Sequence, residues 1–154
     1  MHEHFLQQAI NLAAANVSQG GGPFGAIIVK QGEVIATGVN RVTQQLDPTA
    51  HAEIQAIRAA CQTLNDFQLT DCVLYSSCEP CPMCLGAIYW TRLKAVYFAC
   101  SRYDAANAEF DDSFIYNDIT LPLEQRSIVM QQIQLINALY PFKVWTQQTN
   151  KIFY

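Results

Sequence analysis

Three residues in the middle of the chain have side chains and spacing that could bind a metal ion. They are His51 and the C-x-x-C pair Cys81 and Cys84. Zinc favours imidazole and thiolate ligands, and three protein ligands leave the fourth tetrahedral position for water, as in catalytic sites. All three lie at the starts of expected helices, and a helix N-terminus favours the thiolate form of cysteine. These residues predict a catalytic site for a single zinc ion per chain.

The cysteine spacing also allows other interpretations. Cys78 and Cys81 form a second C-x-x-C pair, but Cys78 lies at an expected strand end, so we favour Cys81 with Cys84. A lone C-x-x-C in an α/β chain can be a redox dithiol. If Cys78 supplied a fourth ligand, the site would be closed, and the chain would be a non-enzymatic structural zinc module.

Glu53 lies two residues after His51 and could supply acid–base chemistry. Side chains at positions i and i+2 do not share a helix face, so Glu53 is not expected to bind the same ion. A carboxylate beside a metal-bound water can act first as a general base and then as a general acid. The ordinary alternative is a first-turn glutamate that the helix dipole favours.

Composition limits the classes of protein that this chain can belong to. It has 154 residues, of which 51% are hydrophobic and 14% charged, enough to bury the core of one domain. The net charge is −4, and the nine Lys and Arg form no run, which disfavours a polyanionic partner such as nucleic acid. No apolar run reaches membrane-spanning length, and the first residues do not resemble a signal peptide. We therefore expect a cytoplasmic protein with no membrane partner, whose six cysteines are reduced.

Hydrophobic periodicity predicts strands that alternate with helices. Helices are expected over residues 3–18, from a cap at Asp47 or Thr49 to about Leu64, and at about 82–91 and 141–150. Short apolar runs predict five strands, at 25–30, 33–39, 72–76, 95–100 and 128–133. Residues 101–127 should be irregular with one short helix. We expect one domain over residues 1–154, a three-layer α/β/α sandwich around a five-stranded mixed sheet.

The two motifs together resemble the cytidine deaminase-like superfamily, whose signature is H-x-E followed by P-C-x-x-C. In this chain the signature reads HAE at 51–53 and PCPMC at 80–84, within the wider segment DPTAHAEI at 47–54. The resemblance implies the cytidine deaminase-like fold and a zinc-dependent deaminase, with His51, Cys81 and Cys84 as ligands and Glu53 as the catalytic acid and base.

Two branches of the superfamily compete for this chain. The tRNA adenosine deaminases share both blocks but tend to carry a basic C-terminal helix, whereas the last thirty residues here contain only Lys143 and Lys151 as basic side chains. The bacterial guanine deaminases are similar over nearly the whole length, including GGPFGA at 21–26 and FDDSFIY at 110–116. That resemblance implies hydrolysis of a small purine base, guanine, to xanthine and ammonia.

The same resemblance implies roles for six further residues. Asn40, Ala52 and Asp112 would contact the base, Phe24 and Trp90 would wall the pocket, and Tyr154 would close it. Five of the six have an ordinary alternative: Phe24 and Trp90 as core aromatics, Asn40 as a turn residue, Asp112 as a solvated carboxylate and Tyr154 as a frayed terminus. The resemblance also suggests a homodimer in which the C-terminal segment, about 141–154, is exchanged between subunits.

Overall fold

The computed structural model describes residues 1–154, which divide into two compact units, Met1–Asp112 and Ser113–Tyr154. The first unit combines helices with one β-sheet, and the second contains short helices joined by irregular segments, without a strand. None of the helices has the length and apolar character that crossing a membrane requires.

The sheet has the strand order β2-β1-β3-β4. Strands β1 (Gly25–Lys30) and β2 (Glu33–Val39) form an antiparallel hairpin whose two turn residues, Gln31 and Gly32, both have positive φ. This backbone geometry matches the twist of the flanking strands. Strand β3 (Cys72–Cys78) pairs antiparallel with β1 and parallel with β4 (Ala95–Cys100), so the sheet is mixed.

The sheet has four strands, and the predicted fifth strand at 128–133 is wrong. The β-branched residues Ile128, Val129 and Ile133 favour extended backbone, but a strand is stabilised by pairing with a neighbour. The unit that contains them has no strand to pair with.

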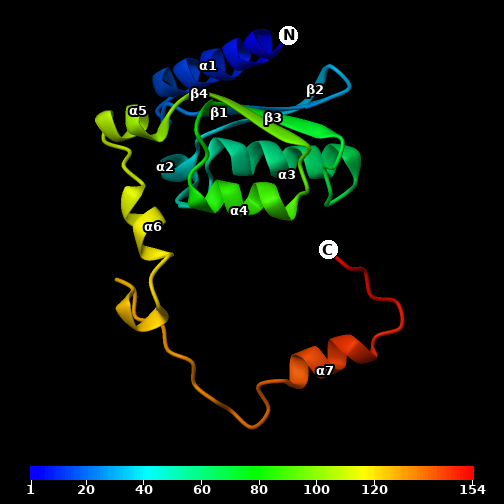
Figure 1. The fold of residues 1–154 in the computed structure, drawn as a ribbon. Helices are drawn as coiled ribbons and strands as arrows, with labels where there is room; N and C mark the ends of the chain where they lie inside the picture. Colours follow the sequence, from blue (N-terminus) through cyan, green and yellow to red (C-terminus); the bar gives the residue numbers. More distant parts are fainter. The chain divides into compact units, whose positions relative to one another are not determined.

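Helices cover both faces of the sheet, which confirms three layers for the first unit (Figure 1). Helix α1 (His2–Ser18) lies on one face, and α3 (Ala52–Leu64) and α4 (Pro82–Trp90) lie on the other. Strand β1 is buried and contributes side chains to the cores on both faces of the sheet, because successive side chains of a strand point to opposite faces. Ile27 belongs to the core cluster with Phe5 of α1, and Ile28 belongs to the cluster with Ile57 of α3.

Helix α3 begins later than predicted. The carboxylate of Asp47 accepts hydrogen bonds from the amide nitrogen and the hydroxyl of Thr49, at 2.8 and 2.7 Å, which folds this segment into a turn. The helix starts at Ala52, and His51 occupies the N-cap position with extended backbone. A short helix that the periodicity missed, α2 (Val42–Gln45), precedes this turn. The turn thus places a candidate metal ligand, rather than Asp47 or Thr49, at the helix mouth.

Residues 101–127 contain more helix than expected. Helix α5 (Arg102–Asn107) ends the first unit and begins with a capping box between Ser101 and Asp104. Helix α6 (Ser113–Asp118) and the 3₁₀ helix η1 (Leu123–Gln125) follow in the second unit. The segment is therefore a series of helices of at most six residues, each too short to show a periodic pattern.

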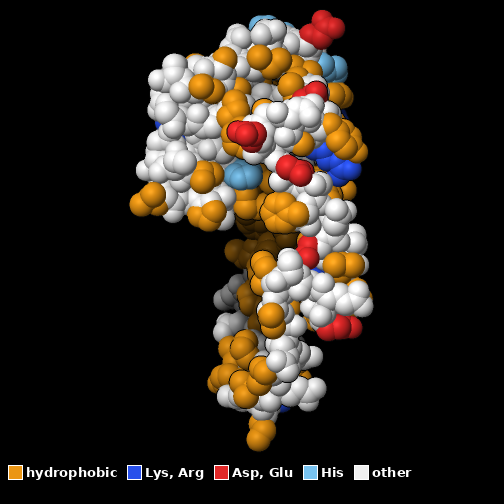
Figure 2. Space-filling model, turned by 90° about the vertical axis from the view of Figure 1, so that its left-hand side faces the viewer, with side chains coloured by type: hydrophobic (Ala, Val, Ile, Leu, Met, Phe, Trp, Pro, Cys, Tyr) orange, Lys and Arg blue, Asp and Glu red, His pale blue; other side chains and the backbone are white.

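The second unit exposes apolar side chains over much of its surface (Figure 2). Its last helix, α7 (Tyr140–Gln147), buries no residue, and Phe142 is 69% exposed. The tail folds back on α7: Lys151 Nζ donates to the Thr146 carbonyl at 2.7 Å, and the Phe153 ring meets Trp145 edge-on at 6.3 Å. The predicted final helix, at about 141–150, is confirmed. In the structure it begins at Tyr140 and ends at Gln147.

Candidate active site

The candidate metal ligands lie at the N-termini of α3 and α4. His51 and Cys81 are the two N-cap residues, both with extended backbone. Pro82 starts α4, a position where its missing N–H costs no helical hydrogen bond. Strand β3 ends at Cys78, just before this second cap. The end of a parallel strand pair and two helix mouths therefore meet, as is common for sites in α/β folds.

The three ligand atoms already have the spacing of a zinc site. His51 Nδ1 lies 3.5 Å from both Cys81 Sγ and Cys84 Sγ, and all three atoms lie within 4.8 Å of one another. Zinc–ligand bonds of ~2.0–2.3 Å at tetrahedral angles hold neighbouring donor atoms roughly 3.5 Å apart. The residues present therefore fit a zinc ion with little movement.

The electrostatic environment of the two thiols also favours binding of a metal ion. A hydrogen bond from Cys84, aided by one from His51, lowers the pKa of Cys81 to about 4. The hydrogen bond between Cys84 and Cys81, together with burial, raises the pKa of Cys84. The hydrogen bond between His51 and Cys81 likewise raises the pKa of His51. Cys81 therefore favours the thiolate form and Cys84 the protonated form, and a bound zinc ion would displace the remaining thiol proton.

Cys78 is not part of this group. Its thiol donates to the Ser101 carbonyl at 3.6 Å, and burial raises its pKa to about 11. The group comprises His51, Cys81 and Cys84 with no fourth acidic, histidine or cysteine ligand. This geometry favours the chosen C-x-x-C pair and an open site, and it disfavours the closed structural zinc module.

Glu53 lies in the first turn of α3 and is only 6% exposed. Its carboxylate accepts a hydrogen bond from Ser76 Oγ of β3 at 3.5 Å. Burial raises its pKa, with the negative charge on Cys81 adding to the effect. Sequence analysis missed Ser76, although a polar Ser76-Ser77 pair inside an apolar, buried strand is a signal that such a partner exists. Glu53 is thus a buried carboxyl group held near the metal ligands.

A close approach between β2 and α3 positions His51. A Cβ atom on Gly38 would lie 2.1 Å from the carbonyl oxygen of Ala52, the residue that follows His51. Ala52 itself is fully buried. Only glycine at position 38 allows the start of α3 to lie this close to the strand.

Phe24 and Asn40 lie together at the open end of the β1–β2 hairpin. The amide nitrogen of Asn40 donates to the Phe24 carbonyl at 3.2 Å, and the Phe24 ring meets Phe110 edge-on at 5.0 Å. The Asn40 side-chain oxygen accepts from the Val42 amide at 3.3 Å, so this amide has a fixed orientation. Gly22 leaves room for it, because a Cβ there would lie 3.1 Å from Asn40 Cγ.

The remaining expected substrate residues have different locations. Asp112 is partly buried, and burial raises its pKa, with the negative charge on Cys81 adding to the effect; it therefore feels the charge of the metal-ligand group. Trp90 is the last residue of α4, 63% exposed and ~12 Å along the helix from its first residue. Tyr154 lies in the second unit and is 74% exposed. The substrate roles of all six residues stay predictions.

Residues 1–100 match the family model of the cytidine and deoxycytidylate deaminase zinc-binding region. The chain belongs to this family, and it is a zinc-dependent deaminase. Among its relatives, guanine deaminase from Bacillus subtilis is 58% identical over 151 residues, 97% of both chains. The crystal structure of guanine deaminase from Bacillus subtilis matches with a TM-score of 0.98 at 57% identity, covering 100% of this chain and 99% of that one.

A tRNA-specific adenosine deaminase from Aquifex aeolicus is also similar, at 45% identity over 97 residues. That similarity covers 63% of this chain and 64% of the relative. The likeness to the tRNA enzyme is therefore limited to part of the chain, whereas the likeness to the guanine deaminase covers nearly all of it.

Proposed function

We propose that this enzyme hydrolyses guanine to xanthine and ammonia. The observation that carries the proposal is the buried Glu53, held by Ser76 beside an open group of one imidazole and two thiols. This arrangement supports hydrolytic deamination, and the full-length similarity to the Bacillus subtilis guanine deaminase supports guanine as the substrate.

His51, Cys81 and Cys84 would hold the zinc ion, which supplies Lewis-acid activation of a water molecule when bound. Glu53 accepts a proton from the attacking water and delivers it to the ring nitrogen next to the amino-bearing carbon. The second water proton goes to the departing amine, so guanine and water are converted to xanthine and ammonia. Burial suits Glu53 to this exchange, because it raises the pKa of the carboxyl group and so favours the protonated form that carries the proton.

The base would bind at the hairpin end that contains Phe24 and Asn40. The Asn40 amide donates to and accepts from a polar edge of the purine, and the Phe24 ring packs against its face. Ala52 lies between His51 and Glu53, so its backbone contacts the base near the reacting carbon. The partly buried carboxylate of Asp112 accepts hydrogen bonds from the donor-rich edge of guanine, which offsets the cost of its burial.

Glu53→Gln tests the mechanism, with Glu33→Gln, exposed at the start of β2, as the matched control. Loss of the proton shuttle should lower guanine turnover by at least ~10²–10⁴-fold, the usual contribution of general acid–base catalysis. Zinc content should stay at the wild-type level in both variants, and the control should turn over guanine normally. Near-normal xanthine production by Glu53→Gln would refute the mechanism, and inosine formation in a tRNA stem-loop with guanine untouched would refute the substrate.

We also propose that the enzyme is a homodimer in which segment 141–154 packs on the second copy, where Tyr154 closes the pocket and Trp90 contributes to its wall. The support is that α7 buries no side chain, while Tyr89 and Trp90 of α4 are also exposed, at 71% and 63%. Exposed apolar surface of this extent commonly marks an interface.

Co-expression of Glu53→Ala with a chain lacking residues 151–154 tests the exchange: activity should reappear in mixed dimers. Mixed dimers that stay inactive while both chains bind zinc would refute it.

A further inference from the structure

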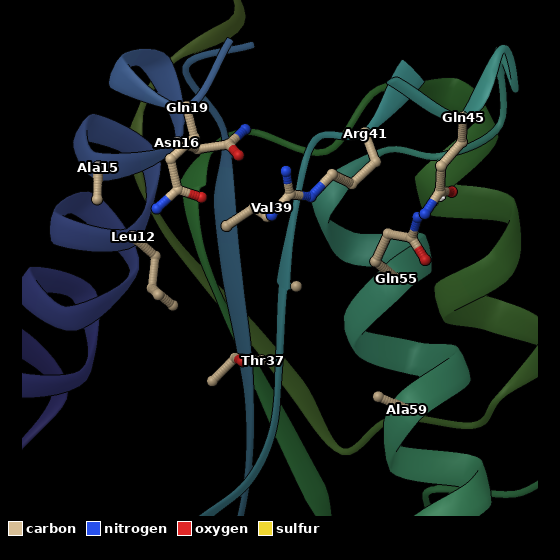
Figure 3. Close-up of a pocket in the computed structure, with 11 residues that line it drawn as sticks. Leu12, Ala15, Asn16, Gln19, Thr37, Val39, Arg41, Gln45, Gln55 and Ala59 are labelled. Atoms are coloured by element: carbon tan, nitrogen blue, oxygen red, sulfur yellow. Dashed lines mark hydrogen bonds between the residues drawn. The ribbon is translucent and has the colours of Figure 1, made fainter. Parts of the chain in front are cut away.

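A groove lies at the outer edge of the sheet, apart from the zinc ligands. It has a volume of about 420 Å³ and runs between the end of α1, the edge strand β2 and helix α3. None of the residues His51, Glu53, Cys81 and Cys84 lines it. Figure 3 shows side chains from all three elements arranged around the same space. Its volume is within the range of small-molecule sites.

Arg41 is the one charged residue that lines the groove. Its backbone is fixed by a hydrogen bond from its amide nitrogen to the Ala50 carbonyl at 2.9 Å, and its side chain reaches into the space between α1 and α3 (Figure 3). In a chain with a net charge of −4, this guanidinium forms no ion pair, whereas Arg58 pairs with Asp47. A guanidinium group presents a planar set of donors that matches carboxylate or phosphate oxygens, so the groove favours an anion.

Asn16 adds an unsatisfied acceptor on the opposite wall. Its amide nitrogen donates to the carbonyl oxygens of Gly22 and Asn40 at 2.9 and 2.8 Å. Its oxygen, Oδ1, is the one buried side-chain nitrogen or oxygen atom that has no hydrogen-bond partner. An unpaired buried polar group is costly, so the wall requires a donor such as a ligand N–H.

The other walls combine side-chain amides with small apolar groups. Gln55 Nε2 donates to Gln45 Oε1 at 2.8 Å, which leaves the Gln45 amide hydrogens and the Gln55 oxygen available. Leu12, Val39 and Ala59 supply the apolar surface. A flat ring with polar edges is the chemistry that fits amides above an apolar surface.

We propose that this groove binds a purine nucleoside monophosphate. The phosphate pairs with Arg41, an N–H of the base donates to Asn16 Oδ1, and the amides of Gln45 and Gln55 bond to the remaining polar edge. A free base lacks the anion that Arg41 requires, and inorganic phosphate lacks the donor and the ring. The site is additional to the deaminase site and does not depend on the substrate proposed above.

Isothermal titration of the zinc-loaded, full-length protein with GMP tests the proposal. Wild-type protein should bind GMP at least tenfold more tightly than guanosine or inorganic phosphate. Arg41→Gln should weaken GMP binding about tenfold or more, because a charge-assisted, bidentate contact is lost. Ala59→Leu should weaken it by filling the groove while Arg41 remains. Lys30→Gln, which makes the same charge change at the far end of β1, should bind GMP as the wild type does.

The location of binding is checked by the side-chain amide resonances of Gln45 and Gln55 in ¹H–¹⁵N spectra, which should shift on addition of GMP. Circular dichroism and zinc content confirm that each variant folds. The proposal is overturned if wild-type protein binds no GMP at millimolar concentration, or if GMP and guanosine bind equally. It is also overturned if both Arg41→Gln and Ala59→Leu bind GMP normally, because the nucleotide then occupies another place on the protein.

Discussion

The Gly38→Ala variant should show whether Gly38 positions the metal site or only contributes to the stability of the fold. The new Cβ would lie 2.1 Å from the Ala52 carbonyl oxygen and 2.4 Å from the Ala56 amide nitrogen, both backbone atoms of α3. To restore a separation of 3.0 Å from 2.1 Å, the start of the helix must retreat by about 0.9 Å. His51 immediately precedes Ala52 and moves with it, which changes its position relative to Cys81 and Cys84.

The expected losses follow from this displacement. Overpacking of a tight contact costs ~1–3 kcal/mol of unfolding free energy. A shift of this size at a reacting group can cost ~10²-fold in turnover, so we expect kcat/KM for guanine to fall by about that factor. Zinc content after dialysis against a weak chelator should fall as well, because the imidazole no longer meets both thiols.

Gly25→Ala is the matched control. Its Cβ would lie 2.5 Å from the Ala9 carbonyl oxygen and 2.7 Å from the Ala13 amide nitrogen, so it displaces α1 on the opposite face of the sheet. We expect a comparable loss of stability in thermal unfolding, with zinc content and kcat/KM per folded molecule close to wild type. If Gly38→Ala binds zinc and turns over guanine as well as Gly25→Ala does, the close approach of β2 to α3 does not position His51.

Other predictions address single contacts of the site. Cys84→Ser should lose zinc in a metal analysis while Cys78→Ser retains it, because only the former removes a ligand; the reverse result would move the site to the other C-x-x-C pair. Ser76→Ala should lower kcat for guanine by roughly two- to tenfold with normal zinc content, since one long hydrogen bond to Glu53, at 3.5 Å, is lost; an unchanged kcat would show that Ser76 does not orient this carboxylate. Deletion of residues 151–154 should lower guanine turnover sharply while zinc content and circular dichroism persist; unchanged turnover would exclude a role for the tail in closing the pocket.

Local sequence was sufficient to predict the parts of the site that depend on neighbours along the chain. The helices that follow His51 and Cys81 were both predicted, although the first begins at its cap His51 and not at Asp47 or Thr49. Short apolar runs at 25–30 and 33–39 likewise predicted strands β1 and β2 with the observed bounds.

Features that depend on contacts between distant segments could not be predicted in this way. Asn16 is polar yet buried in α1, because its amide bonds to the Gly22 and Asn40 carbonyls, whereas the neighbouring Val17 is apolar yet 52% exposed. The expected strand at 128–133 has strand-forming residues, yet no neighbouring strand in its unit pairs with it.

The sequence alone thus determined the ligand types, the helix mouths that contain them and the class of chemistry. Only the tertiary structure decided which cysteines meet His51, that Ser76 holds Glu53, and that Gly38 sets the position of α3. The physical reason is that helix caps and tight turns are stabilised by residues a few positions apart. Ligand geometry, carboxylate burial and close backbone approach instead depend on how separate elements pack, which no local pattern encodes.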